Sequence, residues 1–304
     1  MGFCPITGSS SIKYLITQRP SSMQTSFMHN TYAILMLLFG LWGGLAVGST
    51  RPVHAQSDTV SPDEEIIDRL TQRPDLLVYY GSMDEQAVEG VRQSPLNLSD
   101  ADIQMLIEQA RQAYDSTAIS RDVRTHVREQ YDAERARAVV DGFDRPAVQR
   151  TDSLARYDAD FTAIQQYAQT LTADAVGEER IQIMRTLIQT GDAITGFAEA
   201  TVRLQQAIFQ AVQHIDPGAA EEIDRSVLET RSREMATNFV PVTMFYIYQD
   251  VPTETLQAYA DFYTGEAGQW YQQVRSGAEA YAEEQAAERL VTGVRQAVEA
   301  RGEE

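Results

Sequence analysis

Residues 250–284, with the sequence DVPTETLQAYADFYTGEAGQWYQQVRSGAEAYAEE, decide the fold. Two runs of apolar residues at helical spacing flank a short segment that contains Gly265 and Gly268. The first run consists of Leu256, Tyr259, Ala260 and Tyr263, and the second of Trp270, Val274, Ala278 and Tyr281. Each run would form the buried face of one helix, and a glycine in the turn would allow a positive φ. The stretch therefore predicts a helical hairpin whose aromatic side chains meet across a short connection.

Helical spacing of apolar residues continues through most of the chain after residue 60. Residues 76–80 (LLVYY) are the one run that could pass for a strand, yet the pattern continues at helical spacing to Val91. Long helices are expected at residues 119–143, 144–171, 194–215 and 219–248. Pro241 is expected to kink the last of them or to begin a new segment. We predict an all-α fold of helical hairpins packed into one or two antiparallel bundles.

Two parts of the chain resemble each other. Residues 187–194 (LIQTGDAI) can be laid on residues 70–77 (LTQRPDLL), and a shift of 119 residues places Phe262 on Phe143. This pattern indicates an internal duplication of a helical unit. Shared composition of two amphipathic stretches would produce a similar likeness. The predicted division is a signal segment at residues 1–55, an N-terminal helical unit at residues 56–176 and a C-terminal unit at residues 177–304.

The N-terminal segment has the features of an export signal. Residues 1–55 contain no Asp or Glu, and residues 33–48 (AILMLLFGLWGGLAVG) are uncharged and apolar. Val53 and Ala55 would stand at positions −3 and −1 of a cleavage site after residue 55. The alternative is an uncleaved membrane anchor, because residues 31–50 are about long enough to span a bilayer. We expect a bacterial protein that is periplasmic or secreted.

The chain is strongly acidic, with a formal net charge of −19. Such a charge disfavours nucleic acid and anionic membrane surfaces as partners. Salt screens the repulsion within an acidic surface, so adaptation to high salt is one explanation for this composition. An ordinary acidic surface is the other explanation.

The composition also excludes several kinds of chemistry. Lys13 and Cys4 are the only residues of their types, and both precede the predicted cleavage site. The exported chain would therefore lack the side chains for a Walker phosphate loop, Schiff-base chemistry and thiol or zinc-cysteine sites. His126, beside Asp122, is expected to be half-buried, and His214 to complement the negative end of its helix. No catalytic, cofactor-binding or metal-ligating residue is predicted.

The hairpin stretch resembles the C-terminal repeat of the bacterial domain-of-unknown-function family 2059, which consists of small exported helical proteins. The residues that carry the resemblance are Thr253, Glu254, Leu256, Phe262, Tyr263, Gly268 and Gln269. Gly265 and Glu266 stand where the family has Ser-Pro. The resemblance covers mainly residues 250–285 and implies a helical envelope protein, without catalytic residues.

Three functions remain open at this stage. The first is a non-enzymatic structural or protein-interaction role in the envelope, with another envelope protein or a second copy of the chain as partner. The second is binding of an apolar or cationic small ligand between helices that carry Tyr246, Tyr248, Tyr259 and Tyr263. The third is a hydrolase with two carboxylates of raised pKa facing one pocket. A divalent-cation site from clustered acids is also conceivable.

Overall fold

The computed structural model describes residues 61–302, apart from residue 95, residues 158–160 and residues 220–223. The described residues form an all-α fold without strands, as the spacing of apolar residues predicts. The first helices are α3 (Pro62–Thr71), α4 (Pro74–Gln93), α5 (Asp100–Ala113), α6 (Ser116–Glu129), α7 (Ala133–Phe143) and α8 (Pro146–Leu154). They are followed by α9 (Phe161–Thr170), α10 (Ala173–Val176), α11 (Glu178–Thr190), α12 (Ala193–Ile215), α13 (Arg225–Ile247), α14 (Thr253–Thr264) and α15 (Glu266–Gly302).

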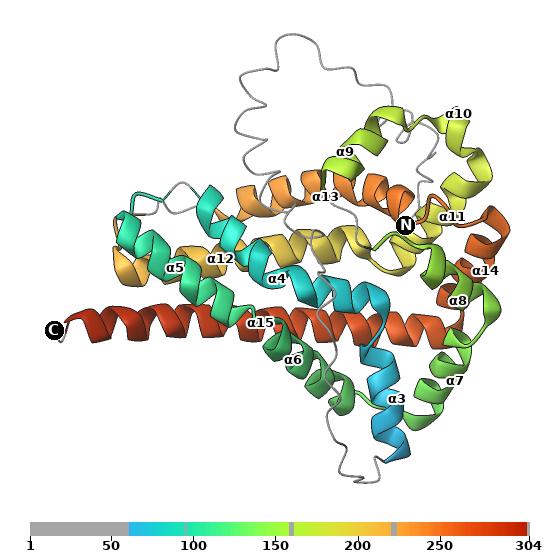
Figure 1. The fold of residues 1–304 in the computed structure, drawn as a ribbon, viewed down its shortest axis with the longest axis horizontal. Coiled ribbons are helices and arrows are strands. Elements are labelled where there is room, and N and C mark those ends of the chain that lie inside the picture. The colour runs from blue at the N-terminus through green and yellow to red at the C-terminus, as the bar shows by residue number, and fades with distance from the viewer. Residues whose placement is uncertain (1–60, 95, 158–160, 220–223, 303–304) are drawn as a thin grey trace, which may run out of the picture.

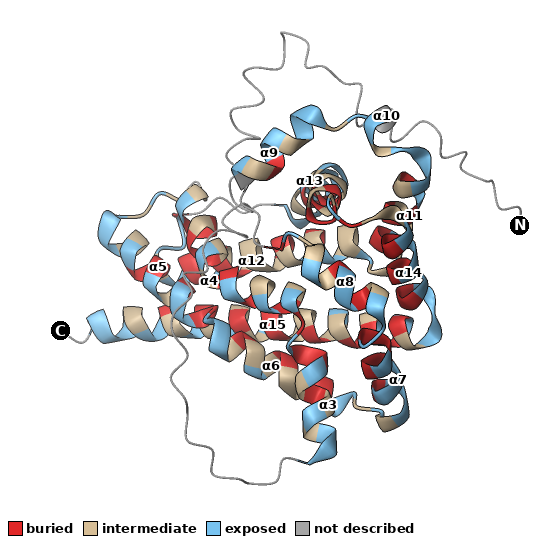
Figure 2. Ribbon diagram, turned by 45° about the vertical axis from the view of Figure 1, so that its right-hand side comes forward, coloured by how far each residue is buried: buried red, intermediate tan, exposed pale blue. Residues whose placement is uncertain are grey.

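The helix α15 is the spine of the molecule and runs along its longest axis (Figure 1). Its 37 residues make a rod of roughly 55 Å at about 1.5 Å per residue. One side of the rod packs against α5, α6 and α7, and another side packs against α12. In turn α13 lies on α12, and α4 lies beside α5 and α6. Buried residues follow α14 and α15 through the interior, whereas α9 and α10 are largely exposed (Figure 2).

The predicted hairpin consists of α14 and α15, which are joined through Gly265 alone. Leu256, Phe262 and Tyr263 are buried in the main core. The Phe262 ring packs edge-on against the rings of Phe143 at 5.8 Å and Tyr263 at 4.8 Å between centroids. Such edge-to-face pairs are favourable for aromatic rings. The aromatic content of this stretch therefore builds the core at the turn.

The two glycines of the turn do not provide the positive φ that the sequence suggested. Gly265 has a φ of −72°, so neither it nor the helical Gly268 uses a positive φ. Gly268 is required by close packing instead, because a Cβ there would lie 2.3 Å from the Phe262 carbonyl oxygen. Gln269, which is exposed, donates from its amide nitrogen to the Thr264 carbonyl and so closes the last turn of α14.

Two of the expected long helices are each divided in two. The segment at residues 119–143 breaks after α6 because the Asp132 carboxylate accepts from the backbone N–H groups of Glu134 and Arg135 and caps α7. The segment at residues 144–171 breaks after α8, where the Arg156 N–H donates to the Ile247 carbonyl. A local cap in the first case and a tertiary hydrogen bond in the second replace helical hydrogen bonds.

Pro241 does not begin a new segment, because α13 continues through it. An internal proline removes one helical hydrogen bond and is unfavourable in a helix. Here the surrounding residues bury Val240 and Thr243 on α13, and no residue from Phe239 to Gln249 is exposed. Packing on several sides holds the helix together across the proline.

The main hydrophobic core contains residues from both sides of the predicted boundary at residue 177. Two pairs of packed helices in the first half have counterparts in the second half. The pair α3 and α7 corresponds to α11 and α14, and the pair α4 and α5 corresponds to α12 and α13. The internal duplication stays a prediction, and these pairs are the geometry that it would have. The predicted signal segment and its cleavage site lie outside the described residues. Among the described helices, none is both long and apolar enough for a membrane span.

Candidate ligand-binding cavity

A cavity of about 410 Å³ lies within the helical assembly. Residues of α4, α11, α12, α13, α14 and α15 line it, together with residues between helices. Sites for small molecules are commonly clefts of about 300–1,000 Å³ lined by apolar and a few polar groups. The cavity has the dimensions of such a site.

An apolar part of the cavity wall comes from α12 and α13. Phe197 and Leu204 come from α12, and Val240, Met244 and Ile247 come from α13. On each helix these residues recur at spacings that place them on one face. These side chains can hold hydrocarbon, and α12 also brings the charged residues Glu199 and Arg203 to the cavity.

Another part of the wall is polar, and α15 provides much of it. The α15 residues that line the cavity include Gln272, Arg275, Ser276, Glu279 and Glu283. They recur at i, i+3, i+4, i+7 and i+11, which is one face of a helix. An internal helix thus presents a polar stripe to the cavity and an apolar stripe to α5, α6 and α7.

Two arginines hold the acids of this wall in ion pairs. The Arg203 Nε donates to the buried Glu283 carboxylate at 2.7 Å, and the Tyr79 hydroxyl donates to the same carboxylate. Burial raises the pKa of Glu283. The charge of Arg203 and the hydrogen bonds from Arg203 and Tyr79 lower this pKa in part. The Arg275 Nε donates to Glu279 at 2.8 Å. A second nitrogen of Arg275 donates to Asp75 in the first turn of α4.

One end of the cavity is formed by tyrosines. Tyr157, Tyr248, Tyr259 and Tyr263 line it, and they form the tyrosine cluster. The Tyr259 ring lies 4.8 Å from Tyr263 and 5.8 Å from Tyr248 between centroids. Burial raises the pKa of all four hydroxyls, and the charge of Asp75 contributes to the rise. The tyrosine cluster therefore stays protonated and can donate hydrogen bonds.

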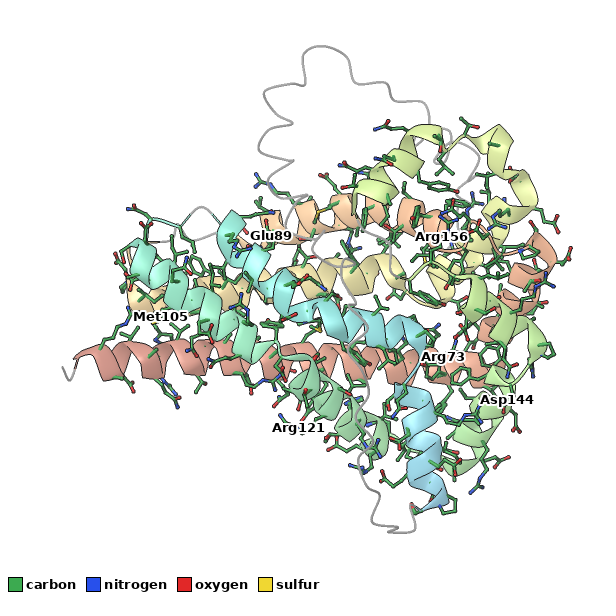
Figure 3. All side chains as sticks on the ribbon, in the orientation of Figure 1. Arg73, Glu89, Met105, Arg121, Asp144 and Arg156 are labelled. Carbon is green, nitrogen blue, oxygen red and sulfur yellow. The ribbon has the colours of Figure 1, made fainter. Side chains whose placement is uncertain are left out.

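Arg73 is a buried residue near the tyrosine cluster that does not line the cavity itself. It lies at the junction of α3 and α4 (Figure 3). Its guanidinium donates to Asp152 at 2.6 Å and stacks on the Phe143 ring at 4.3 Å. Burial raises the pKa of Asp152, although Arg73 lowers it in part. Asp152 is not among the residues that line the cavity.

Two buried polar atoms in the cavity wall have no hydrogen-bonding partner in the protein. They are Oδ1 of Asp75 and Oγ1 of Thr243. Thr243 is only 8 % exposed and lies on the mainly apolar α13 wall. Buried polar groups without partners are uncommon in folded proteins and mark places where another group would be stabilised. Both residues line the cavity, which has room for such a group.

The residues singled out in the sequence are only partly brought together. Of the hairpin motif, Tyr263 lines the cavity, whereas Leu256, Phe262, Gly268 and Gln269 do not. Of the tyrosines proposed for ligand binding, Tyr248, Tyr259 and Tyr263 line the cavity. Tyr246 instead packs on the ring of Tyr167 at 5.5 Å.

The two histidines of the described residues do not line the cavity. His126 is half-buried against the ring of Tyr281, and Asp122 pairs with Arg289 at 2.5 Å rather than with the histidine. His214 is exposed in the last turn of α12. The described residues contain no group of three or more His, Cys, Asp or Glu side chains suited to a metal ion.

Sequence reasoning missed the polar stripe of α15 and the contribution of Asp75. The spacing of Gln272, Ser276, Glu279 and Glu283 was available as a signal. Polar residues at helical spacing predict a solvated face, however, and only the packing of α4 and α12 turns this face inward.

Comparison of the chain with protein-family models, curated proteins and solved structures found no match. The resemblance to family 2059 therefore stays a prediction that depends on residues 250–285. The function has to be argued from the fold and the cavity.

Proposed function

We propose that this chain is a non-enzymatic binding protein that holds a small, largely apolar molecule between its helices and acts in the bacterial envelope after export. The observation that carries the proposal is the cavity of about 410 Å³, with an apolar wall from α12 and α13 and a polar wall from α15. Apolar surface would provide most of the binding free energy, and the polar wall would orient the molecule.

The acids of the cavity support binding rather than hydrolysis. A carboxylate hydrolase requires an acid and a base or nucleophile that face the same pocket. Among the described residues, Glu283 and Asp152 are the carboxylates whose pKa is raised, and only Glu283 lines the cavity. Glu283 is also held by Arg203 and Tyr79, so its proton is not placed for transfer to a substrate.

A purely structural role, with another envelope protein or a second copy as partner, is the competing function. It would need no internal space, and a protein interior is normally packed to the density of an organic crystal. A cavity with two unpartnered polar atoms is better explained by a ligand.

The test is binding of N-phenyl-1-naphthylamine, a neutral apolar fluorophore that brightens in apolar surroundings. We expect saturable binding to the full chain and at least about a tenfold loss of affinity, or ~1.4 kcal/mol, in Ala200→Phe. Ala200 lies on α12 and lines the cavity, so the larger ring would fill it.

The matched control is Ala138→Phe, which adds the same ring to an exposed position of α7 away from the cavity. It should bind the fluorophore like the unmodified chain, and circular dichroism should show both variants helical. Absence of saturable binding, or equal loss in both variants, would contradict the proposed function.

A further inference from the structure

We propose that the ligand carries a protonated amine, and that this ammonium group binds at Asp75 beside the tyrosine cluster while its hydrocarbon part lies on the α12 and α13 wall. This inference depends on the proposed function, because it names the chemical class of the molecule in the same cavity.

The charges of the cavity favour a cation. Five carboxylates line it, against two guanidinium groups. Each guanidinium is shared by two of these acids: Arg203 contacts Glu283 and, at 3.6 Å, Glu199, and Arg275 contacts Asp75 and Glu279. No arginine of the wall is left without carboxylate partners, whereas the carboxylates exceed the positive charges. An anionic ligand would meet this excess of like charge.

The geometry of Asp75 specifies a hydrogen-bond donor. Its Oδ2 accepts from Arg275, and its Oδ1 is buried without a partner in the protein. An ionised carboxylate is an acceptor only, so the group that satisfies Oδ1 has to donate a hydrogen bond. A charged donor forms a shorter and stronger hydrogen bond with a carboxylate than a neutral donor does. An ammonium group with N–H bonds fits this position better than a hydroxyl group.

The tyrosine cluster adds a second attraction for a cation. Its rings line the cavity near Asp75, and the negative faces of aromatic rings attract positive charge within about 6 Å. Its hydroxyls remain protonated and do not compete as anions for the Asp75 partner. An amine therefore finds both a carboxylate and aromatic faces at the same end of the cavity.

Thr243 provides an independent indication that a ligand with a polar atom belongs here. This residue lines the cavity from α13, and its hydroxyl is buried without a protein partner. A molecule that lies on the apolar side chains of α13 would bring a polar substituent to this hydroxyl. The ligand expected from the two walls is an amphipathic amine with a hydrocarbon body.

The experiment compares octylamine, octyltrimethylammonium, octan-1-ol and octanoate as competitors of N-phenyl-1-naphthylamine at neutral pH. The chain length is constant, so differences in affinity report the head group. We expect octylamine to bind at least about tenfold more tightly than octan-1-ol, and octanoate to bind most weakly. Octyltrimethylammonium should lie between the amine and the alcohol, because it has the charge but no N–H donor.

The variant Asp75→Asn should reduce the preference for octylamine over octan-1-ol to within about twofold, with little change for octan-1-ol. The control is Asp84→Asn, which makes the same change on the same helix at a position that does not line the cavity. It should keep the full preference. If Asp75→Asn does not fold, the order of the four competitors on the unmodified chain decides the question.

The outcomes separate the two proposals. If the fluorophore and all four octyl compounds fail to bind, the proposed function is wrong. If octan-1-ol or octanoate competes as well as octylamine, the cavity binds ligands but the amine inference is wrong. An unchanged preference in a folded Asp75→Asn variant would place the head group elsewhere and overturn the assignment to Asp75.

Discussion

Gly268 shows how a single hydrogen atom in place of a side chain shapes the turn between α14 and α15. A Cβ at this position would lie 2.3 Å from the Phe262 carbonyl oxygen and 2.5 Å from the Tyr263 Cα. Both are backbone atoms of α14, so neither can move aside as a flexible side chain would. The close approach of the two helices at the turn therefore depends on glycine.

We predict that Gly268→Ala destabilises the protein by about 1–3 kcal/mol, because the added methyl group forces the helices apart in a packed core. Chemical denaturation followed by circular dichroism would measure the change. The control is Gly81→Ala on α4, where a Cβ would meet nothing within 4 Å. There the better helix propensity of alanine should stabilise by roughly 0.5–1 kcal/mol. Equal stabilities of the two variants would contradict this account.

The sequence predicted several residues of the hairpin but not always the reason for them. Burial of Leu256, Tyr259 and Tyr263 follows from helical spacing and is confirmed. The need for Gly268 is an approach of two backbones, which no local pattern reveals. Glycine in a turn suggests a positive φ equally well, and that expectation was wrong here.

At the scale of elements, α3 is attached to α6 through charged side chains from distant parts of the sequence. Glu64 on α3 accepts from Arg124 at 2.5 Å and from Arg128 at 2.9 Å, and both arginines lie one turn apart on α6. Arg124 also pairs with Asp68 on α3. These hydrogen bonds lower the pKa of Glu64 to about 2, with Arg128 contributing most.

We predict that this contact stabilises the protein above the ordinary Glu pKa and is lost as the pH falls through the folded pKa. The unfolded chain binds the proton at a higher pH than the folded chain, so unfolding is favoured as the pH falls from about 4.5 to about 2. Glu64→Gln should lower the melting temperature at pH 6 and have little effect near pH 2. Both proteins would be melted across this range by circular dichroism.

The control for this prediction is Glu65→Gln, which makes the same change one residue along α3 at an exposed position. It should leave the melting temperature close to that of the unmodified chain at both pH values. If Glu64→Gln has the same effect at pH 6 and near pH 2, the ionised contact is not what stabilises α3 on α6.

The existence of the helices could be predicted well from the sequence, and their ends less well. Helical spacing identified α12 and α14 closely because glycine, proline and acidic residues mark their ends. The break between α6 and α7 depends on the Asp132 cap, and the break after α8 involves a hydrogen bond to Ile247. Pro241 does not mark a helix end, because the packing around α13 outweighs the unfavourable effect of a proline inside a helix.

At the scale of the whole molecule, the net charge of −19 means that folding concentrates like charges on one surface. Salt screens this repulsion over about 10 Å at moderate concentration and over less at molar concentration. We predict a higher melting temperature in molar sodium chloride than in dilute buffer at neutral pH. Surface ion pairs such as Arg69 with Asp144 would weaken in salt, but each contributes little.

The control for the salt prediction is glucose at the same osmolality, which alters water activity without screening charge. A similar rise in glucose would attribute the effect to solvent exclusion rather than to charge. Equal melting temperatures at low and high salt would contradict the proposed adaptation to salt.

The cavity could be predicted only in outline. The four tyrosines along residues 246–263 suggested a ligand between helices, and three of them line the cavity. The polar stripe of α15 looked like a solvent-facing surface, because its direction depends on α4 and α12, which are distant in sequence. Local spacing shows that a helix has two faces, and tertiary packing decides which of them is inside.

The position of α15 also bears on the order in which the core can be completed during synthesis. The helices that pack against it, including α5, α6, α7 and α12, all precede it in the chain. A growing chain that ends at Gly265 would expose the apolar faces that α15 covers, and it would lack the polar wall of the cavity. Contacts between distant segments form slowly and late. Synthesis of α15 is therefore the step that completes the core, because the helices that pack on it cannot bury those faces before it is made.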